Sequence, residues 1–314
     1  MAERPCVLAI VGPTAVGKTE VTLAVATVIG AEVISADSMQ VYRGMDIGTA
    51  KPTPAERALV PHHLIDIVDP DTPFSVADWV SLARPLVDDI RSRGRVPIVS
   101  GGTPLYFEAL FGRYALVEGA PPDPALRASL GRLAARWGLG YLYGQLRAVD
   151  PVAAARINPS DRKRVIRALE VYLRLGKPLS ALEARAAATR AREATDLVMV
   201  GLWRPREELD RRIEARVRAM LRDGLVEEVS GLLQRGLDPS LPAMQGVGYK
   251  EIAEYLRGHL TLPEAVTLVV RNTRRLAKRQ MTWFRADPRI RWLRVGINIQ
   301  ATVEDIATLL GGKP

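Results

Sequence analysis

The sequence predicts an α/β fold in which helices cover a parallel sheet and an all-helical insertion interrupts the chain. Short apolar runs bounded by turn residues alternate with helical patterns on either side of the middle of the chain. A glycine-rich loop motif separates the first apolar run from the first helical pattern. Between about residues 119 and 196 the apolar runs disappear, and only helical patterns rich in Ala, Arg and Leu remain.

Six apolar runs are the expected strands, and they cover residues 6–11, 31–35, 63–68, 96–100, 197–203 and 289–295. Their alternation with helices is the βαβ pattern, which produces parallel strands with helices on both faces. After residue 203 we expect helices over residues 209–221, 224–234, 250–256 and 263–284. A Pro-rich turn, APPDP, opens the insertion. We therefore expect a core whose first part is residues 1–119, an insertion over 120–195 and the rest of the core over 196–314.

A phosphate-binding loop is expected between the first strand and the first helix. GPTAVGKT matches the pattern G-x-x-x-x-G-K-[ST] directly after CVLAIV and before KTEVTLAVATVI. In such a loop the backbone N–H groups converge on a diphosphate, Lys18 neutralises its oxygens, and Thr19 offers a hydroxyl to Mg²⁺. The loop does not identify the ester, because ATP, another nucleotide or any other diphosphate fits it. The residues assigned to diphosphate binding are Gly12, Pro13, Thr14, Ala15, Val16, Gly17, Lys18 and Thr19.

The ends of two other strands supply the candidate polar groups. Many ATP-hydrolysing proteins have a second apolar strand that ends in a carboxylate, which helps to hold Mg²⁺. Here VPIVS ends instead in Gly101, Gly102 and Thr103, and the candidate carboxylate is Asp37, just past the second strand. The carboxyl ends of parallel strands face one crevice, so we expect Asp37 and Thr103 to face the glycine-rich loop. Asp37 can also cap the segment that follows it.

Basic residues are concentrated near the end of the chain. The net charge is +9, and residues 271–294 contain nine Arg or Lys against a single acid, Asp287. Within this block the spacing i, i+4, i+7, i+8 places Arg271, Arg275, Lys278 and Arg279 on one helical face. The opposite face, with Val269, Val270, Thr273, Leu276 and Ala277, can pack on the core. Such a basic face either binds a polyanion or is simply solvated.

Two aromatic residues end this helix. Trp283 and Phe284 could stack on nucleic-acid bases, but an aromatic pair at a helix end is more often part of the core, which is the interpretation we favour.

Composition excludes several classes of protein. Of 314 residues, 47% are hydrophobic and 25% charged, which is ordinary for a globular chain, and no apolar run approaches the roughly 20 residues of a membrane span. The first residues lack the features of a signal peptide. Cys6 is the single cysteine and there are only three His, so a disulfide is excluded and a zinc cluster is disfavoured. We expect a cytoplasmic protein with no membrane partner.

Seven segments of the sequence, taken in order, match one known family. They are GPTAVGKT, ISADSMQVYRGMDIGTAKP, HHLIDIVDP, IVSGGTPLY, DPVAAARINPSDRKRVIRALEVY, GVGYKE and RLAKRQMTWFR. The chain resembles the tRNA dimethylallyltransferases along nearly its whole length. The glycine-rich loop alone is common to many folds, whereas the segments around Asp37 and RLAKRQ are specific to this family. The resemblance implies a P-loop kinase-like α/β fold, and the lack of a eukaryotic-type zinc finger favours a bacterial form.

The resemblance also implies the reaction. The dimethylallyl group of dimethylallyl diphosphate is transferred to the N6 amine of the adenosine that follows the tRNA anticodon, and diphosphate is released. Asp37 is then expected to act as general base, with Lys18 and Mg²⁺ on the diphosphate and Thr103 near the N6 group or the diphosphate. An arginine of LDRRIEARVRAM, Arg212 or preferably Arg216, would complete the anion site, unless this helix only presents a solvated charged face.

The resemblance further implies that the anticodon stem-loop is the RNA partner. Its target base must leave the stack to react, so extensive RNA contacts are expected, with the insertion holding the stem and the protein acting as a monomer. The residues expected to contact tRNA are Asp37, Ser38, Met39, Gln40, Thr103, Arg127, Asp161, Arg162, Lys163, Arg164, Val165, Gln245, Gly246, Lys250, Arg275, Lys278, Arg279 and Gln280.

Two alternatives come from other classes of function. A small-molecule or nucleoside kinase of the same fold would need ATP and an Arg-bearing lid, which the Arg-rich insertion could provide. A non-catalytic RNA-binding protein could use the loop only to control binding. Turnover of ATP would indicate the kinase, and transfer of a prenyl group in vitro would exclude the RNA-binding protein.

Overall fold

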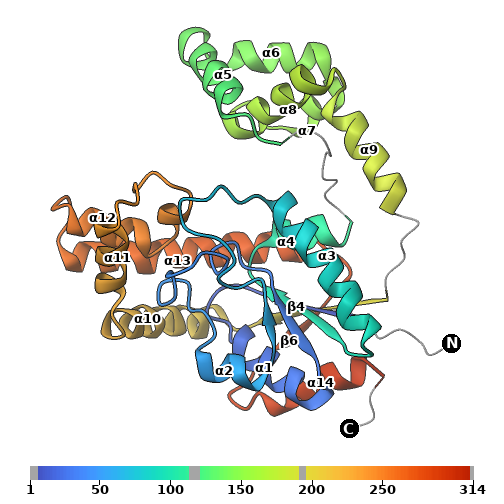
Figure 1. Cartoon of the computed structure of the whole chain (residues 1–314), viewed down its shortest axis with the longest axis vertical. Helices are drawn as coiled ribbons and strands as arrows, with labels where there is room; N and C mark the ends of the chain where they lie inside the picture. Colours follow the sequence, from blue (N-terminus) through green and yellow to red (C-terminus); the bar gives the residue numbers. More distant parts are fainter. Residues whose placement is uncertain (1–5, 113–120, 191–195, 312–314) are drawn as a thin grey trace. The chain divides into compact units, whose positions relative to one another are not determined.

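The computed structural model describes residues 6–112, 121–190 and 196–311 (Figure 1). The chain divides into two compact units. The sheet unit comprises residues 1–107 and 195–314, and the helical unit comprises residues 108–194. None of the helices in the described ranges is both long and apolar enough to cross a bilayer.

The sheet unit is built on six parallel strands. They are β1 (Val7–Val11), β2 (Glu32–Ser35), β3 (His62–His63), β4 (Pro97–Gly101), β5 (Leu197–Trp203) and β6 (Ile290–Arg294). Their order across the sheet is β3-β2-β4-β1-β5-β6, and every neighbouring pair is parallel. The predicted α/β fold with a parallel sheet flanked by helices is confirmed. Chain order reverses at β1, and in open sheets ligands bind beyond the carboxyl ends of the strands at such a point.

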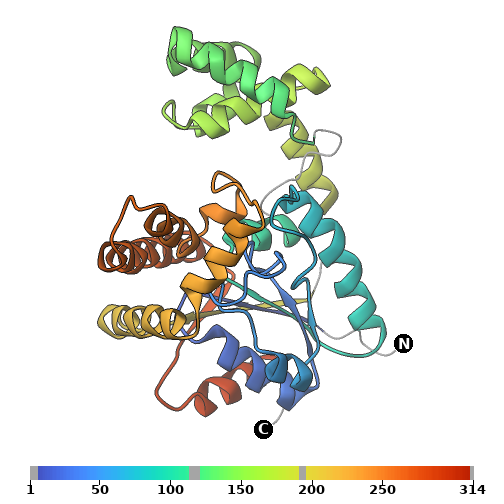
Figure 2. The same ribbon diagram turned by 60° about the vertical axis from the view of Figure 1, so that its left-hand side comes forward.

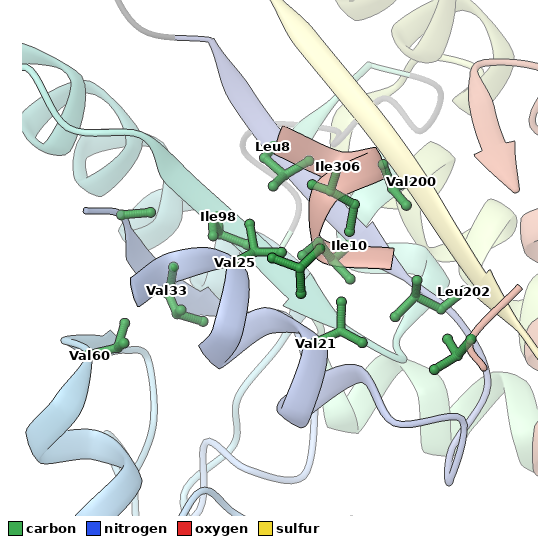
Figure 3. Close-up of a cluster of buried hydrophobic side chains, with 14 of the residues drawn as sticks. Leu8, Ile10, Val21, Val25, Val33, Val60, Ile98, Val200, Leu202 and Ile306 are labelled. Carbon is green, nitrogen blue, oxygen red and sulfur yellow. The ribbon is translucent and has the colours of Figure 1, made fainter. Parts of the chain in front are cut away.

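Helices pack on both faces of this sheet. On one face α1 (Lys18–Ile29) and α14 (Gln300–Leu309) lie side by side (Figures 1 and 2). Val21 and Val25 of α1 point toward Ile10, Ile98 and Ile306, and all of these side chains are buried (Figure 3). Burying each such side chain stabilises the fold by roughly 1.5–3 kcal/mol. This packing fixes the N-terminus of α1 against the end of β1.

The other face is covered by α3 (Val76–Ser92), α4 (Pro104–Leu110) and the long α13 (Leu262–Arg285). Trp79 of α3 is fully buried, stacks on Tyr106 of α4 at 4.4 Å between centroids, and donates its indole N–H to the carbonyl of Ser35 at 3.0 Å. Phe107 of α4 meets Phe284 of α13 edge to face at 5.8 Å. The aromatic cluster therefore connects the end of β2 with α4, and α4 with α13.

The third strand is much shorter than the sequence predicted. The apolar run over 63–68 was expected to be a full strand, but β3 has only two residues. The backbone of Leu64 and Asp66 is left-handed, with φ of 61° and 57°, which an extended strand cannot accommodate. Asp66 instead turns its carboxylate to Lys51 at 2.5 Å and to Arg57 at 2.7 Å. The ion pair with the buried Lys51 thus overrides the apolar pattern.

The helices after β5 follow the prediction closely. They are α10 (Arg206–Arg222), α11 (Leu225–Gln234), α12 (Tyr249–Leu256) and α13, with a 3-10 turn at Ala243–Gln245 before α12. We did not predict α14. The short helix α2 (Pro54–Leu59) is held by a capping box between Thr53 and Glu56.

The helical unit contains α5 (Pro124–Trp137), α6 (Leu139–Val149), α7 (Pro151–Arg156), α8 (Arg162–Leu175) and α9 (Leu179–Arg190). Its core is formed by Leu130, Leu142, Leu146, Val165 and Leu169, which are all buried. A fully buried carboxylate, Glu170, accepts two hydrogen bonds from Arg127 at 2.8 and 2.9 Å. That pair joins α5 to α8.

Candidate active site

The glycine-rich loop has the backbone geometry that a phosphate site needs. Gly12 has φ of 155°, and a Cβ there would lie 2.7 Å from the carbonyl oxygen of Leu202. Gly17 has φ of 105° and caps the N-terminus of α1. A side chain is excluded at the first position and strained at the second, so the glycines let the loop follow β5 and turn into α1. The loop therefore presents the N-terminus of α1, where anions are stabilised.

Lys18 lies at the centre of the site. Its ammonium donates to the carbonyls of Gly12 at 3.0 Å and Pro13 at 2.9 Å, so it is folded over the loop. Burial lowers the pKa of Lys18 to about 8; the charge of Asp37 opposes this shift, and Arg216 reinforces it. Burial likewise lowers the pKa of Arg216, again against the effect of Asp37. Asp37, Lys18 and Arg216 therefore interact electrostatically across one site.

A pocket opens between the loop and the ends of β2 and β4. It is lined by Lys18, Thr19, Thr22, Val33, Ser35, Asp37, Gln40, Pro52, His62, Ser100 and Gly101. Four of these residues, Lys18, Thr19, Asp37 and Gln40, were assigned to the site from the sequence. Ser35, His62 and Ser100 were missed, although the positions of Ser35 and Ser100 at the carboxyl ends of their strands are the signal that identified Asp37.

Asp37 has one oxygen used and one available. Its Oδ1 accepts the backbone N–H of Met39 at 2.9 Å, which is the local turn role considered as an alternative for this residue. Within the described parts of the chain no hydrogen bond reaches its Oδ2. Asp37 also contributes, after burial, to raising the pKa of the Tyr106 phenol. The two roles proposed for Asp37, turn acceptor and base, are compatible.

The end of β4 explains why glycines stand where a carboxylate is common. A Cβ on Gly101 would lie 2.1 Å from the carbonyl oxygen of Ala36, and one on Gly102 would lie 2.6 Å from Nε2 of Gln280. The chain after β4 thus packs directly on the segment after β2. Thr103 follows, and its hydroxyl accepts the backbone N–H of Ser38 at 3.0 Å. The structure thus brings Thr103 to the segment that carries Asp37.

Two arginines also form hydrogen bonds to the glycine-rich loop. Arg212 of α10 donates Nε–H to the carbonyl of Ala15 at 2.9 Å, and Arg204 donates Nε–H to the carbonyl of Val16 at 2.8 Å. A Cβ on Gly17 would lie 3.7 Å from both guanidinium groups. Arg204 is buried, directly follows β5, and pairs with Glu208. It was missed in the sequence, while Arg212 and Arg216, four residues apart on α10, were both considered.

Two charged side chains hold the chain between the pocket residues Gln40 and Pro52. Glu228 of α11 accepts three successive backbone N–H groups of residues 46–48 at 2.8, 2.8 and 3.1 Å, and the phenol of Tyr249 at 2.5 Å. Lys51 is almost completely buried and pairs with Asp66 at 2.5 Å. These contacts account for the MDIGTAK part of the motif, which is structural here.

Gln280 links the helix α13 to the loop. Its Oε1 accepts the backbone N–H of Thr14 at 2.8 Å, and its Nε2 donates to the carbonyl of Gly102 at 2.7 Å. The side chain is buried. Both ends of the amide are therefore used within the protein, at the junction of the loop and the end of β4.

Several residues expected to contact tRNA have their side chains committed within the fold. Besides Gln280, Gln40 accepts the hydroxyl of Ser35 at 2.9 Å, Arg127 pairs with Glu170, and Val165 is fully buried in the helical unit. Residue type and position in a motif do not reveal such partners. The tRNA contacts assigned to these four residues stay predictions.

Other residues expected to contact tRNA are exposed, or lie next to one another in the fold. Arg162, Lys163 and Arg164 are exposed at the start of α8. A Cβ on Gly246 would lie 2.5 Å from the terminal methyl of Met39, so the segments around these two residues lie against each other. Two stretches assigned to RNA binding, far apart in the sequence, therefore form one surface.

The basic face of α13 is exposed as predicted. Arg271, Arg275, Lys278 and Arg279 are exposed, and the structure gives none of them an ion pair within its described residues, whereas Val269 and Ala277 are buried. The prediction that the terminal aromatic pair belongs to the core holds for Phe284 but is wrong for Trp283, which is 37% exposed. Trp283 lies four residues after Arg279, so it continues the basic face.

Comparison with known proteins identifies the family. A family model described as IPP transferase matches residues 40–287, and one described as isopentenyl transferase matches residues 5–61. The tRNA dimethylallyltransferase of Moorella thermoacetica is 54% identical over 295 residues, which cover 91% of this chain and 89% of that protein. The tRNA dimethylallyltransferase of Geobacter sulfurreducens is 51% identical over 290 residues, which cover 92% of each.

Solved structures agree with this assignment. The full-length tRNA isopentenylpyrophosphate transferase of Bacillus halodurans superposes with a TM-score of 0.72 at 42% identity, covering 98% of this chain and 96% of that one. A eukaryotic dimethylallyltransferase acting on tRNA superposes with a TM-score of 0.80 at 27% identity, covering 98% and 80%. The resemblance inferred from the motifs is confirmed. The chain belongs to the tRNA dimethylallyltransferase family.

Proposed function

We propose that the protein transfers the dimethylallyl group of dimethylallyl diphosphate to the N6 amine of the adenosine on the 3′ side of the tRNA anticodon. The products are N6-isopentenyladenosine and diphosphate. The observation that carries the proposal is the meeting of Asp37 and Lys18 in one pocket beyond the strand ends, with the charge of Arg216 acting on both. A carboxylate next to an anion site is what transfer from a diphosphate to a weakly nucleophilic amine requires.

In this reaction the bond between N6 and C1 of the dimethylallyl group forms while the bond between C1 and the diphosphate oxygen breaks. Asp37 takes the proton that N6 loses, and the available Oδ2 suits that role. Base catalysis of this kind contributes about 10²–10⁴-fold to a rate. Thr103, held against Ser38 of the same segment, would help to place the amine beside the carboxylate.

The diphosphate accumulates negative charge as it leaves, and the cations around the loop stabilise that charge. Lys18, whose ammonium donates to the carbonyls of Gly12 and Pro13, would bring its positive charge to the phosphates. Arg212 already donates to the loop carbonyl of Ala15. Within the described residues Arg216, four residues further along α10, has no hydrogen bond or ion pair, so we assign the guanidinium of the anion site to it.

A magnesium ion fits the donors of this pocket. Thr19, Ser35, Asp37 and Ser100 offer hard oxygen atoms, and Mg²⁺ usually takes few protein ligands and completes its shell with water and substrate phosphate. We assign Thr19 as the protein ligand. When bound, the ion would neutralise charge on the leaving diphosphate.

The acceptor tRNA would bind through the basic face of α13 and the surface shared by residues 38–40 and 245–246. A base stacked in an RNA loop must be flipped out to reach a pocket, so this binding must be extensive. The helical unit adds the exposed cations at the start of α8. We propose that the protein acts on tRNA as a monomer.

One assay tests the proposal. The protein is mixed with Mg²⁺, labelled dimethylallyl diphosphate and unmodified tRNA whose anticodon ends in A, and label in the RNA is measured. Transfer should need no ATP, and Asp37→Asn should serve as the inactive control. Absence of labelled RNA together with ATP hydrolysis or phosphorylation of a small molecule would favour a kinase and refute the proposal.

A further inference from the structure

An exposed aromatic pair stands on the helical unit, away from its core. Trp137 ends α5 and is 59% exposed, and Tyr141 in the first turn of α6 is 48% exposed. Their ring centroids are 6.4 Å apart with an angle of 41° between the planes. The guanidinium of Arg136 lies over the Trp137 ring, 5.0 Å from its centroid. Two adjacent side chains of this size are rarely left in water without a function.

The core of the helical unit does not need these rings. Leu130 of α5 and Leu142 and Leu146 of α6 already fill the interface between the two helices, and each is buried. Leu133, one turn before Trp137 on α5, is itself 39% exposed and extends the apolar surface. The aromatic pair therefore lies at the outer edge of a complete core.

The two helices that carry the pair bear only basic charges. Residues 124–149, which span α5 and α6, contain arginines but no acidic residue. Arg127 pairs with Glu170, but Arg132 and Arg136 are exposed, and among the described residues the structure gives neither of them a carboxylate partner. They stand one turn apart on α5, beside the row of Leu133 and Trp137. Such a surface repels basic partners and attracts polyanions.

We propose that Trp137 and Tyr141 form a stacking platform for an unpaired base of the tRNA substrate, and that Arg132 and Arg136 contact the phosphates beside that base. Exposed aromatic rings beside arginines suit single-stranded RNA, because every base has a face to stack and a phosphate to neutralise. A protein partner of an exposed aromatic pair would be expected to meet a mixed or neutral rim, whereas α5 and α6 carry only basic charges beside these rings. The inference rests on the proposed function for the identity of the RNA.

The test uses the full-length protein and two RNA probes: an unmodified anticodon stem-loop, and a blunt duplex with the sequence of its stem. Affinities are measured at several salt concentrations for the wild type, Trp137→Ala, Trp137→Phe and the double variant Arg132→Ala with Arg136→Ala. The control is Val152→Ala, which trims another exposed apolar side chain of the same unit, 61% exposed on α7. Thermal unfolding of each variant reports whether the fold is intact.

Trp137→Ala should weaken binding of the stem-loop by about 5- to 150-fold with an unchanged salt dependence, because stacking on a base releases no counterions. Trp137→Phe should restore much of that affinity, since it keeps an aromatic face. The double arginine variant should instead flatten the dependence of log affinity on log salt by about 1.4. Binding of the blunt duplex should not respond to Trp137, and Val152→Ala should match the wild type.

The proposal is overturned if Trp137→Ala binds the stem-loop like the wild type, or if it weakens the duplex equally. It is also overturned if the wild type self-associates through this surface, so that Trp137→Ala lowers the mass in solution and leaves RNA affinity unchanged. If the wild type transfers the prenyl group but Trp137→Ala has unchanged RNA affinity, the platform is refuted and the proposed function is kept. If Trp137→Ala loses RNA binding but the wild type transfers no prenyl group, the platform is kept and the proposed function is refuted.

Discussion

Removing two cations from the exposed face of α13 tests whether that face binds RNA. Arg275 and Lys278 are exposed, and within the described residues no carboxylate pairs with either. Their neighbour Arg274 is different, because it pairs with Glu214 at 2.5 Å and Asp210 at 3.3 Å and so joins α13 to α10. Changing Arg275 and Lys278 together to Ala should therefore remove charge without removing a structural ion pair.

The expected magnitude follows from counterion release. Removing one cation that neutralises a phosphate flattens the slope of log affinity against log salt by about 0.7 for single-stranded and about 0.9 for duplex RNA, taking the DNA value for the duplex. Removing both cations should therefore change the slope by about 1.4–1.8. Over a fourfold rise in salt, the affinity of the wild type for tRNA should fall about 7- to 12-fold more than that of the double variant.

The assay is a salt titration of tRNA binding, with thermal unfolding measured in parallel. Arg95→Ala is a suitable control, because Arg95 is half exposed and contacts Glu32 at the amino end of β2, whereas the loop and the pocket lie at the carboxyl ends of the strands. Glu32 keeps Arg93 and His63 as partners in that variant, and the salt slope should not change. A double variant with an unchanged slope and a lowered melting temperature would show that the pair is structural and refute the assignment of this face.

Four further outcomes are expected. Asp37→Ala should slow transfer by about 10²-fold or more in a single turnover while donor affinity stays nearly intact, because a base acts on the nucleophile; a rate close to wild type would remove Asp37 from that role. Lys18→Ala should weaken donor binding and slow the chemistry, and a variant with weakened ATP affinity alone would contradict this. The protonated Lys18 binds the anion and its pKa is about 8, so kcat/KM for the donor should fall as pH rises through about 8 in the wild type but not in Lys18→Arg, whose guanidinium stays charged. Gln280→Ala leaves the N–H of Thr14 and the carbonyl of Gly102 without this partner, so it should raise the donor Michaelis constant and lower the melting temperature, at about 1–3 kcal/mol for each group left unpaired; a variant that behaves like the wild type would rule out this hydrogen-bonding role.

Local patterns in the sequence predicted most of the fold. Five of the six strands are close to their apolar runs, because a strand buried in a parallel sheet needs a continuous apolar stretch. The third failed because the pattern of 63–68 does not show that Lys51 draws Asp66 into a left-handed turn. Helix α14 was missed since its amphipathic pattern is short and is completed only by packing of Ile306 on the sheet.

Part of the candidate site could be predicted from the sequence and part could not. The loop at 12–19 and the strand-end position of Asp37 were readable, because both depend on residues close together in the chain. Arg204 and the role of Gln280 were not, since each contacts the loop from more than 180 residues away.

The sequence by itself determined the α/β fold, the phosphate-binding loop, the basic face of α13 and the family to which the chain belongs. Only the tertiary structure decided which polar side chains are free to act. Gln40, Arg127 and Gln280 have residue types that suit RNA contacts, yet their partners lie within the protein, while Trp283 and Trp137 are exposed where an aromatic would ordinarily be buried. The physical reason is that a side chain's availability depends on neighbours brought together by packing, and those neighbours are distant in the sequence.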